Sequence, residues 1–370
     1  MFAAELALHW AERGHEVVVF TADDPSSPAH ARLRIVGGLP VAYNRSSLCA
    51  RLASRLAFRT SAAVAIPWKA RAHGEPDVLV SVGFSPPPLL LTTGRSTRRL
   101  RRVTWLFDLW PDVLLAHRPH SGVLRACEPT LRRLTATYLD RCDDVVAISS
   151  RMGDLVGKRV ARARLHTIPL WAPAAAEAKE GHSPSQGGRP GKLVALYQGN
   201  LGLAYDFEPI LGASRALAET GVSFVLSGEG AQRDRLIARI NRDDLRNVEL
   251  RPPAPPEQLA RSLACGDVHL LPLRPGWDGL SFPSKLMASL AVGRPVIVLG
   301  APTSEVAQLV RDAGCGITIP ADGRALAVAL RDLERDEPAR AAMGRAARDL
   351  YTTRFAARWA FEAWDGLIAS

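Results

Sequence analysis

The segment KLVALYQGNLGLAYDFEP, residues 192–209, joins a short apolar run, a glycine-rich turn and the start of a sequence with helical spacing. A continuous apolar run of this length is typical of a parallel strand covered on both faces. Glycines after the run allow a sharp turn or a close approach to a ligand, and the following helix offers free N–H groups. A single glycine after a strand is more often only a turn. The segment predicts a strand, turn and helix unit of an α/β protein.

The same alternation of apolar runs with helical sequence extends along both halves of the chain. Runs of strand length occupy residues 16–20, 77–82, 102–107, 144–149, 192–199, 222–228, 267–273 and 295–300. This order predicts doubly wound parallel sheets of the Rossmann type. Residues 173–191 are rich in Ala, Pro, Gly and Ser and have no apolar period, as expected of a linker. We therefore expect one Rossmann-like domain at residues 1–172 and a second at 192–349.

The composition fits a globular protein of two domains. The chain has 370 residues, of which 47% are apolar and 23% charged. No apolar run reaches the length of a membrane-spanning helix, and the first residues lack the basic start of a signal peptide. These features predict a cytoplasmic location. The five cysteines have no C-x-x-C spacing, so we expect neither disulfides nor a zinc site but buried free thiols.

The net charge of +10 lies entirely in the first half of the sequence. Residues 1–172 contain 24 Lys and Arg against 14 Asp and Glu, and the remainder contains 23 against 23. Five arginines crowd into eight positions: Arg95, Arg98, Arg99, Arg101 and Arg102. Such a cluster attracts anions, and anionic lipid headgroups fit better than nucleic acid because no interleaved aromatic residues accompany it. The alternative is a solvated basic surface.

Lys285 lies in FPSKLMASLAVGRPVI, residues 282–297, between a Pro-Ser pair and an apolar helical stripe. Pro283 suits a first helical turn, Ser281 or Ser284 could cap it, and Gly293 could end the helix. A lysine in the first turn is opposed by the helix dipole, and a bound anion would remove that cost. We expect Lys285 to contact a diphosphate; the alternative is a solvated or salt-bridged lysine.

These motifs together resemble retaining GT-B glycosyltransferases of family GT4. The resemblance is strongest to the bacterial branch that builds capsule, O-antigen and exopolysaccharide, including colanic-acid and fucosaminyltransferase-like enzymes. In the second half it rests on YQGNLGLAYDFEPIL (197–211), SGEGAQRDRL (227–236) and the segment with Lys285. In the first half it rests on residues 13–22, 75–91, 103–114, 143–152 and 166–173. The resemblance implies two Rossmann-like domains facing across a cleft, with a last helix, residues 350–370, that returns to the first domain.

The resemblance also implies roles for individual residues. Donor-side contacts fall on Gly199, Asn200, Gly202, Gly228, Glu229, Gly230, Arg251, Pro252, Ser284, Lys285 and Leu286. Lys285 would receive the donor diphosphate and act in catalysis. On the acceptor side, Asp108 and Asp112 fall where the first domain faces the cleft, although Asp108 could equally cap the next segment.

The implied reaction moves a hexosyl or N-acetylhexosaminyl unit from a nucleotide-sugar to an acceptor hydroxyl. Uridine is the commonest donor nucleoside in this branch, and guanosine is the alternative. The acceptor would be a glycan, a lipid-linked glycan or another glycoconjugate, reached at the inner face of the membrane. Cations and N–H donors can stabilise the departing diphosphate. Because no D-x-D sequence follows a strand, we expect no metal and no further cofactor.

Two departures from the family pattern bear on these expectations. Leu280 and Ala288 occupy the positions of an E-x7-E pattern, so Glu229 or Asp278 would have to take over a hydroxyl contact. The chain also begins within the family's first helix, which predicts that about 25 residues carrying a first strand and glycine-rich loop are missing.

The same sequence features leave three other classes of protein as alternatives to the transferase. A Rossmann dehydrogenase would need a complete G-x-G-x-x-G after its first strand, and SGEGAQRD supplies only the first pair of glycines. A catalytically impaired nucleotide-sugar-binding protein would bind nucleotide without transfer. A basic membrane-surface protein would bind anionic vesicles and ignore nucleotides.

Overall fold

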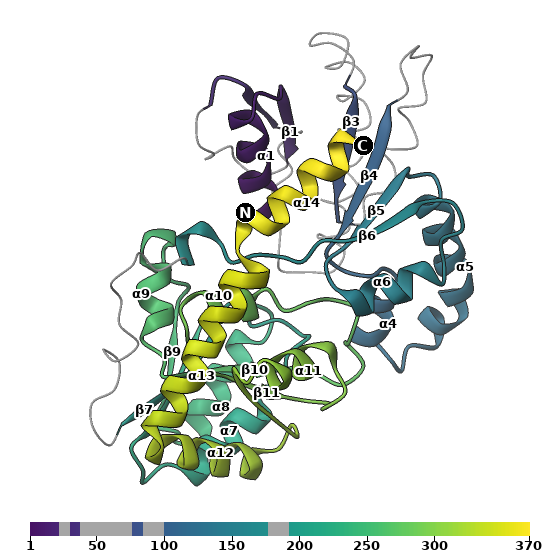
Figure 1. Ribbon diagram of the computed structural model, residues 1–370. Helices are drawn as coiled ribbons and strands as arrows, with labels where there is room; N and C mark the ends of the chain where they lie inside the picture. Colours follow the sequence, from purple (N-terminus) through teal and green to yellow (C-terminus); the bar gives the residue numbers. More distant parts are fainter. Residues whose placement is uncertain (22–29, 38–75, 84–99, 177–191) are drawn as a thin grey trace. The chain divides into compact units, whose positions relative to one another are not determined.

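The computed structural model describes residues 1–21, 30–37, 76–83, 100–176 and 192–370, which form two compact units (Figure 1). The first unit comprises Met1–Pro111, Ala126–Ile168 and Phe361–Ser370; the second comprises Asp112–Arg125 and Pro169–Ala360. Both are built on parallel strands connected by helices, as the sequence predicts. Most of the expected linker lies outside the described residues. None of the described helices is both long and apolar enough to cross a membrane.

The first unit contains two parallel sheets. Strands β1 (Val17–Thr21) and β2 (Leu33–Gly37) form a pair, and four further strands pair in chain order: β3 (Val78–Val82), β4 (Arg101–Leu106), β5 (Asp144–Ala147) and β6 (Arg164–Thr167). The helices of this unit are α1 (Phe2–Glu12), α6 (Ser150–Gly157), most of α5 (Gly122–Leu139) and the end of α14 (Ala357–Ala369), whereas α4 (Asp112–His117) and the start of α5 belong to the second unit.

The C-terminal end of α14 belongs to the core of the first unit. Trp364 is fully buried, and its ring lies 5.0 Å from that of Trp105 and 5.9 Å from that of Trp10. Asp365 accepts a hydrogen bond from Trp10 Nε1 at 3.2 Å. Trp359, by contrast, is 42% exposed. The cause is that Trp359 lies at the start of α14, ahead of the segment that packs in this core.

Asp144 is a fully buried carboxylate at the start of β5. It accepts hydrogen bonds from Arg101 Nε at 2.6 Å, from Arg164 Nε at 2.9 Å and from His166 Nε2 at 2.8 Å. Burial acts to raise the pKa of Asp144, but these three donors hold it at about 2.

The expectation that Arg101 belongs to a surface patch is therefore wrong, because its side chain is committed to this buried carboxylate. The backbone N–H of Arg102 donates to Asp143. Arg95, Arg98 and Arg99 lie outside the described residues.

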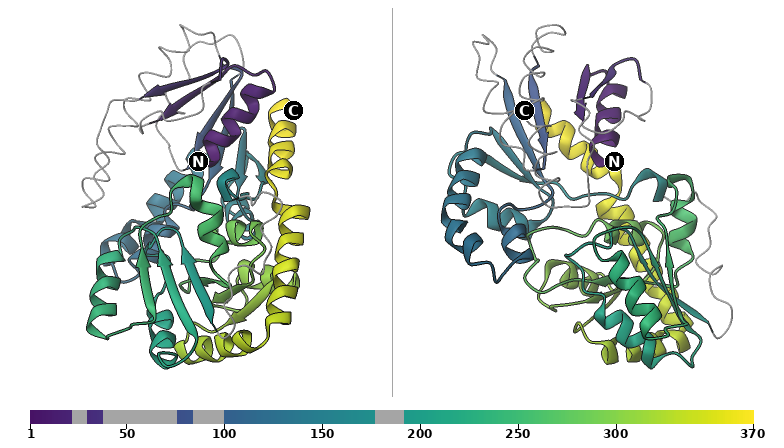
Figure 2. Two further views of the ribbon diagram at one scale, coloured as in Figure 1. Left: turned by 90° about the vertical axis from the view of Figure 1, so that its left-hand side faces the viewer. Right: turned by 180° about the vertical axis from the view of Figure 1, so that it is seen from behind.

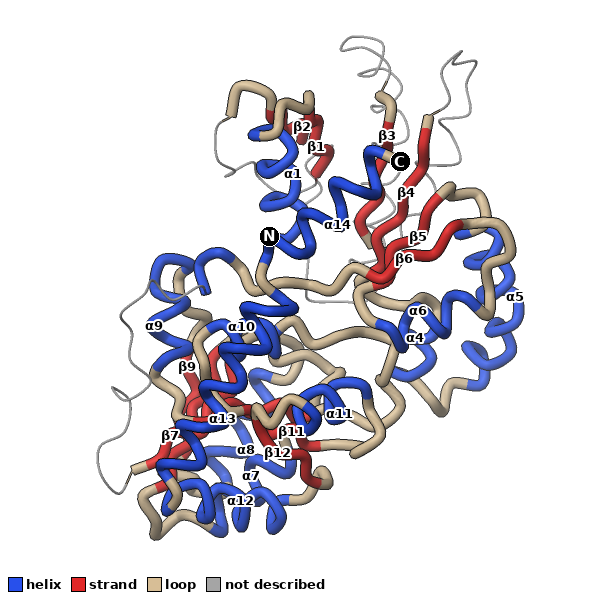
Figure 3. The backbone as a smooth tube through the Cα atoms, viewed as in Figure 1, coloured by secondary structure: helices blue, strands red, loops and turns tan. Residues whose placement is uncertain are grey.

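The second unit is built on a six-stranded parallel sheet, drawn in red in Figure 3, with the order β12-β11-β10-β7-β8-β9. The strands are β7 (Leu193–Gln198), β8 (Val222–Ser227), β9 (Val248–Arg251), β10 (Val268–Pro272), β11 (Val296–Leu299) and β12 (Gly316–Ile319). The strand order reverses between β7 and β10, both of which are central. Ligands of such sheets bind beyond the carboxyl ends of the strands near this reversal.

Helices cover both faces of this sheet, as the apolar strands require (Figure 2). The helices are α7 (Glu208–Ala216), α8 (Arg233–Arg242), α9 (Leu259–Ala264), α10 (Lys285–Ala291), α11 (Glu305–Asp312), α12 (Gly323–Arg335) and α13 (Glu337–Leu350), with short turns η1 (Ala174–Ala176) and η3 (Pro256–Gln258). A π-helical turn, η4 (Tyr351–Phe355), follows α13. One core joins β7 and β8 to residues of α7, α8 and α12. On the other face α10 contacts β10 and α13.

The described cysteines are all free thiols, but only two of the four are buried. Burial raises the pKa of Cys142 to about 12 and that of Cys315 to about 11. Cys127 and Cys265 are exposed, so the prediction of buried thiols is wrong for them. Cys49 lies outside the described residues.

Candidate functional site

The predicted donor-side residues gather at the carboxyl ends of β7, β8 and β9 and at the start of α10. Two of the loops that carry them are joined by backbone hydrogen bonds. Gly199 N–H donates to the Ser227 carbonyl at 2.8 Å, and Leu201 N–H donates to the Glu229 carbonyl at 2.8 Å. The loops after β7 and β8 therefore form one continuous rim rather than two independent turns.

The glycines of this rim make a close packing of the two loops possible. Gly228 has φ +152°, and a Cβ on it would stand 1.9 Å from the Gly199 carbonyl oxygen. A Cβ on Gly230 would stand 2.6 Å from both Asn200 and Leu201. The sequence suggested that these glycines let backbone approach a ligand, and the structure adds that they first let the loops approach each other.

Lys285, the first residue of α10, extends over Gly199 to the rim. A Cβ on Gly199, whose φ is +134°, would stand 2.5 Å from Lys285 Cε. Lys285 Nζ lies 4.0 Å from the ring centroid of Tyr205 and 5.4 Å from that of Tyr197. Among the described carboxylates none forms an ion pair with it. The half-buried position lowers the pKa of Lys285 from 10.5 to about 8, through desolvation. Lys285 is thus a half-buried lysine that contacts aromatic rings and has no ion pair within the described ranges.

Helix α10 confirms part of the sequence expectation and corrects the rest. Leu286, Met287, Leu290 and Ala291 are buried, and Gly293 follows the helix with φ +64°. However, α10 has only seven residues, and the Ser284 side chain makes no capping hydrogen bond because Ser284 already has helical dihedrals. A short uncapped helix has a weak dipole, so the lysine itself is the principal positive group at this point.

Leu286, expected beside the diphosphate, is turned into the protein. Its side chain is fully buried, and its N–H donates to the Pro283 carbonyl at 2.9 Å. Of the three adjacent residues predicted there, only Ser284 and Lys285 have side chains that are partly exposed.

A buried histidine supports α10 from behind. His269 Nε2 lies 2.9 Å from the Leu263 carbonyl, an acceptor, so this nitrogen carries the proton. His269 Nδ1 lies 2.6 Å from Ser289 Oγ, which in turn lies 3.0 Å from the Lys285 carbonyl. Burial lowers the pKa of His269 to about 4, so the ring is neutral at pH 7. The single Ser289 hydroxyl proton is donated either to His269 Nδ1 or to the Lys285 carbonyl, so one of these two contacts is a hydrogen bond at a time.

Two predicted polar residues on the rim pair with near neighbours in the sequence. Arg251 Nη2 lies 2.6 Å from Glu249 Oε2, and this contact lowers the pKa of Glu249. Arg251 and Glu249 line a surface hollow of about 280 Å³ over β7, β8 and β9. Glu229 forms an ion pair with Arg233 at 3.1 Å. Exposed ion pairs of this kind are weak, so a ligand can exchange for either of them.

The remaining predicted residues lie apart from the rim or serve its scaffold. The Pro252 carbonyl accepts a hydrogen bond from Ser227 Oγ at 3.0 Å. Asp278, a candidate for a hydroxyl contact, accepts the N–H of Glu305 at 3.1 Å and so holds the start of α11. Asp108 follows β4 in the first unit and is exposed, whereas Asp112 begins α4 in the second unit and is buried.

Four residues of the rim were missed by the sequence analysis: Tyr197, Tyr205, Gln232 and Arg274. Gln232 Nε2 donates to the carbonyls of Gly202 at 2.7 Å and of Tyr205 at 3.0 Å. Arg274 Nε also donates to the Tyr205 carbonyl, at 3.1 Å. Both tyrosines belong to the strand and turn of residues 192–209. Nothing in the sequence indicates that Lys285, 80 positions beyond Tyr205, lies against their rings.

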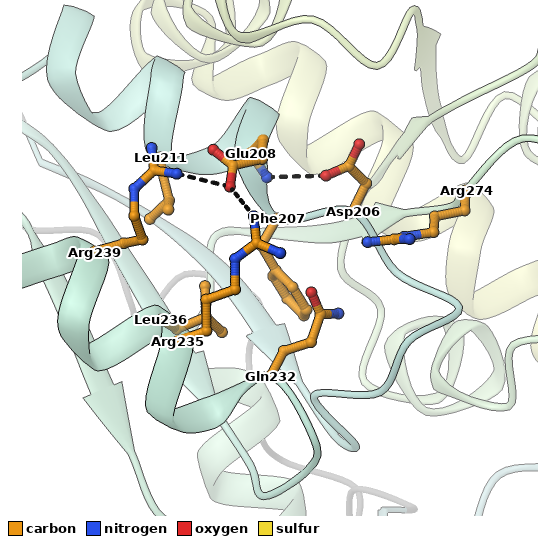
Figure 4. Close-up of a pocket in the computed structure, with 9 residues that line it drawn as sticks. All are labelled: Asp206, Phe207, Glu208, Leu211, Gln232, Arg235, Leu236, Arg239 and Arg274. Atoms are coloured by element: carbon orange, nitrogen blue, oxygen red, sulfur yellow. Dashed lines mark hydrogen bonds and ion pairs between the residues drawn. The ribbon is translucent and has the colours of Figure 1, made fainter. Parts of the chain in front are cut away.

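A small cavity lies beside the rim, between the starts of α7 and α8 (Figure 4). Arg235 and Arg239 reach Glu208 across it at 3.1 and 2.9 Å, and Asp206 accepts the Glu208 N–H. Its volume is about 20 Å³, room for about one water molecule, so it cannot hold a sugar nucleotide.

The comparisons with protein-family models assign both halves of the chain. The model described as Glycosyltransferase Family 4 matches residues 1–172, and the model described as Glycosyl transferases group 1 matches residues 193–336. Together the matches span most of the sequence. The first half of the chain is therefore similar to family 4 glycosyltransferases and the second half to group 1 glycosyl transferases.

One relative of known name is similar to the chain over most of its length. A putative colanic acid biosynthesis glycosyl transferase, WcaI of Escherichia coli K12, is 29% identical over 255 residues, 66% of this chain. The match spans 62% of the length of that relative.

Solved structures show that the fold is GT-B. Sucrose-phosphate synthase from Thermosynechococcus elongatus superposes with a TM-score of 0.74 at 17% identity, covering 98% of this chain and 90% of its own. Anabaena HepE in complex with UDP and glucose gives 0.69 at 16% identity, covering 99% and 96%. The fold class predicted from the sequence is therefore confirmed.

Proposed function

We propose that the chain transfers a hexosyl or N-acetylhexosaminyl unit from a UDP-sugar to an acceptor hydroxyl, with retention of configuration. The acceptor is a glycan, a glycolipid or another glycoconjugate. One observation carries the proposal: the half-buried Lys285 ammonium lies at the glycine-lined rim without a carboxylate partner among the described residues. The matches to the two glycosyltransferase models and the UDP bound by Anabaena HepE support the same choice of donor.

The chemistry requires stabilisation of a leaving group. As the bond from the anomeric carbon to the donor phosphate breaks, negative charge develops on UDP and positive charge on the sugar ring. Lys285 would stabilise that negative charge without a metal ion. The acceptor oxygen forms the new bond on the face from which UDP departs, and its proton passes to the departing phosphate. We assign donor binding to residues 192–349 and acceptor binding to residues 1–172, where the exposed Asp108 would contact the acceptor.

Thermal stability in the presence of nucleotides tests the donor site. UDP at about 100 times its dissociation constant should stabilise the protein by about 2.7 kcal/mol, whereas GDP, dTDP and ADP should have smaller effects. Lys285→Ala should lose the response. Lys192→Ala is the matched control, because Lys192 is an exposed lysine just before β7, at the opposite edge of the same sheet. Equal responses in both variants would contradict the proposed role of Lys285.

Release of UDP from UDP-glucose and UDP-N-acetylglucosamine tests the reaction itself. Wild type should release UDP from one of them in the presence of a glycan acceptor, equally well with and without EDTA. Proton NMR of the product should show the anomeric configuration of the donor. Binding of UDP without any turnover would instead identify a catalytically impaired nucleotide-sugar-binding protein.

A further inference from the structure

Within the part of the chain that the structure describes, aromatic rings and not a carboxylate contact the Lys285 ammonium. Its Nζ atom lies 4.0 Å from the Tyr205 centroid, close enough for a cation–π contact. Tyr197 stands behind at 5.4 Å from Nζ, with its centroid 5.6 Å from that of Tyr205. A ring attracts an ammonium without neutralising it, whereas a carboxylate would compete with an incoming phosphate.

Tyr205 is itself fixed by three contacts with two neighbouring segments. Its carbonyl accepts hydrogen bonds from Gln232 at 3.0 Å and from Arg274 at 3.1 Å. An isolated β-bridge pairs Tyr205 with Leu273, after β10. The backbone under the ring is thus tied to the starts of α8 and of the loop after β10. These contacts hold the Tyr205 backbone and so fix the point from which its ring extends.

The tyrosine behind it is also immobilised. Tyr197 is fully buried, its hydroxyl donates to the Asn200 carbonyl at 2.5 Å, and its ring meets Phe207 at 4.9 Å. Burial raises the pKa of Tyr197, so it stays neutral. Two aromatic rings therefore lie beside the lysine head group in the described part of the chain.

We propose that Tyr205 is a positioning residue, whose ring holds the Lys285 ammonium over Gly199 and leaves it without a counter-ion among the described residues until the donor diphosphate arrives. This inference rests on the proposed function for its purpose but not for its geometry. Gly199 has no side chain that would block the aliphatic part of Lys285, and the Tyr205 ring fixes the position of the ammonium group. The two residues are six positions apart in one turn, so a single loop defines the location of the cation.

Lysine-selective NMR of the full chain without nucleotide tests the geometry. The sequence has five lysines, Lys69, Lys158, Lys179, Lys192 and Lys285, so the Lys285 signals can be assigned with Lys285→Arg. A ring face shifts the Hε protons above it upfield. Wild type and Tyr205→Phe should show this shift for Lys285, and Tyr205→Leu should lose most of it. An unshifted Lys285 in wild type, or an unchanged shift in Tyr205→Leu, would overturn the proposal.

Affinity for UDP tests the consequence. Tyr205→Leu should bind UDP about tenfold more weakly than wild type, and Tyr205→Phe should recover most of that loss. Trp359→Leu is the control, since it removes an exposed ring that contacts Arg358 at 4.9 Å. Equal weakening in the Phe and Leu variants would refute a role for the ring.

Two further outcomes separate the hypotheses. If wild type binds no nucleotide but the NMR shift follows the ring, the proposed function fails and the positioning of Lys285 by Tyr205 stands. If Tyr205→Leu does not fold, Tyr205→Met replaces it as the variant of similar volume without a ring, with the same expected losses.

Discussion

Gly228 lies so close to Gly199 that a Cβ on residue 228 would stand 1.9 Å from the Gly199 carbonyl oxygen. The same carbonyl belongs to the residue over which Lys285 crosses. The loops after β7 and β8 are therefore coupled, and the position of the lysine depends on a glycine in each of them.

Gly228→Ala should disrupt this coupling. The clash is with backbone, which cannot rotate away, and φ +152° is unfavourable for alanine. We expect a loss of about 2 kcal/mol or more in the free energy of unfolding, measured by urea denaturation, together with loss of UDP binding. The control is Gly366→Ala in α14, where a Cβ meets no neighbour and alanine favours the helix. Wild-type stability in Gly228→Ala would show that the loops can separate without cost.

The fold could be read from the sequence because its strands are continuous apolar runs. Residues such as Leu196 and Val298 are buried between two layers of helices, and such burial leaves a local signal that periodicity detects. The position of Lys285 could be predicted for a similar reason, since a strand-end loop followed by a helix has few conformations. Its neighbours along the chain were enough to place it at the carboxyl edge of the sheet.

The partners of Lys285 and Arg101 could not be predicted in this way. Both residues meet side chains from distant parts of the sequence: Tyr205 in one case, Asp144 in the other. The sequence alone does not distinguish a basic residue that faces solvent from one that contacts an aromatic ring or a buried carboxylate. The burial that distinguishes these cases arises only when the strands pair.

Asp144→Asn should destabilise the first unit. The substitution removes the charge that compensates Arg101 and Arg164, and breaking a buried ion pair from one side costs about 3 kcal/mol. Differential scanning calorimetry measures the effect. Asp154→Asn, on an exposed position of α6, is the control and should melt like wild type. An unchanged melting temperature in Asp144→Asn would mean that the carboxylate contributes nothing net to the first unit.

Arg95, Arg98 and Arg99 of the cluster are proposed to contact an anionic membrane, and Arg102 is left unchanged because it is partly buried in β4. Arg95→Ser, Arg98→Ser and Arg99→Ser combined should reduce binding to vesicles of phosphatidylglycerol in a sedimentation assay, by about 1 kcal/mol for each arginine. Arg101 is left unchanged because its loss would expose Asp144 to the cost just described. The control replaces Arg242, Arg246 and Arg235, three exposed arginines of the second unit. Equal vesicle binding by the first triple variant and wild type would leave the cluster without a membrane role.

The pH dependence of UDP binding follows from the environment of Lys285. Burial lowers its pKa to about 8, so the ammonium predominates at pH 7 and is lost as the pH rises through 8. The terminal phosphate of UDP loses its last proton near pH 6, so its charge is constant above pH 7. Between pH 7 and pH 9 the charged fraction of Lys285 should fall about tenfold, and UDP affinity with it.

Lys285→Arg separates this effect from a general response to alkali. Arginine stays charged throughout the range, so the variant should bind UDP with an affinity that changes little between pH 7 and pH 9. Isothermal titration calorimetry measures both profiles, and the number of protons taken up on binding gives a second reading. Wild type should take up protons as UDP binds near pH 8, because a diphosphate raises the pKa of an adjacent ammonium. A wild-type profile as flat as that of the variant would mean that the Lys285 charge does not contribute to nucleotide binding.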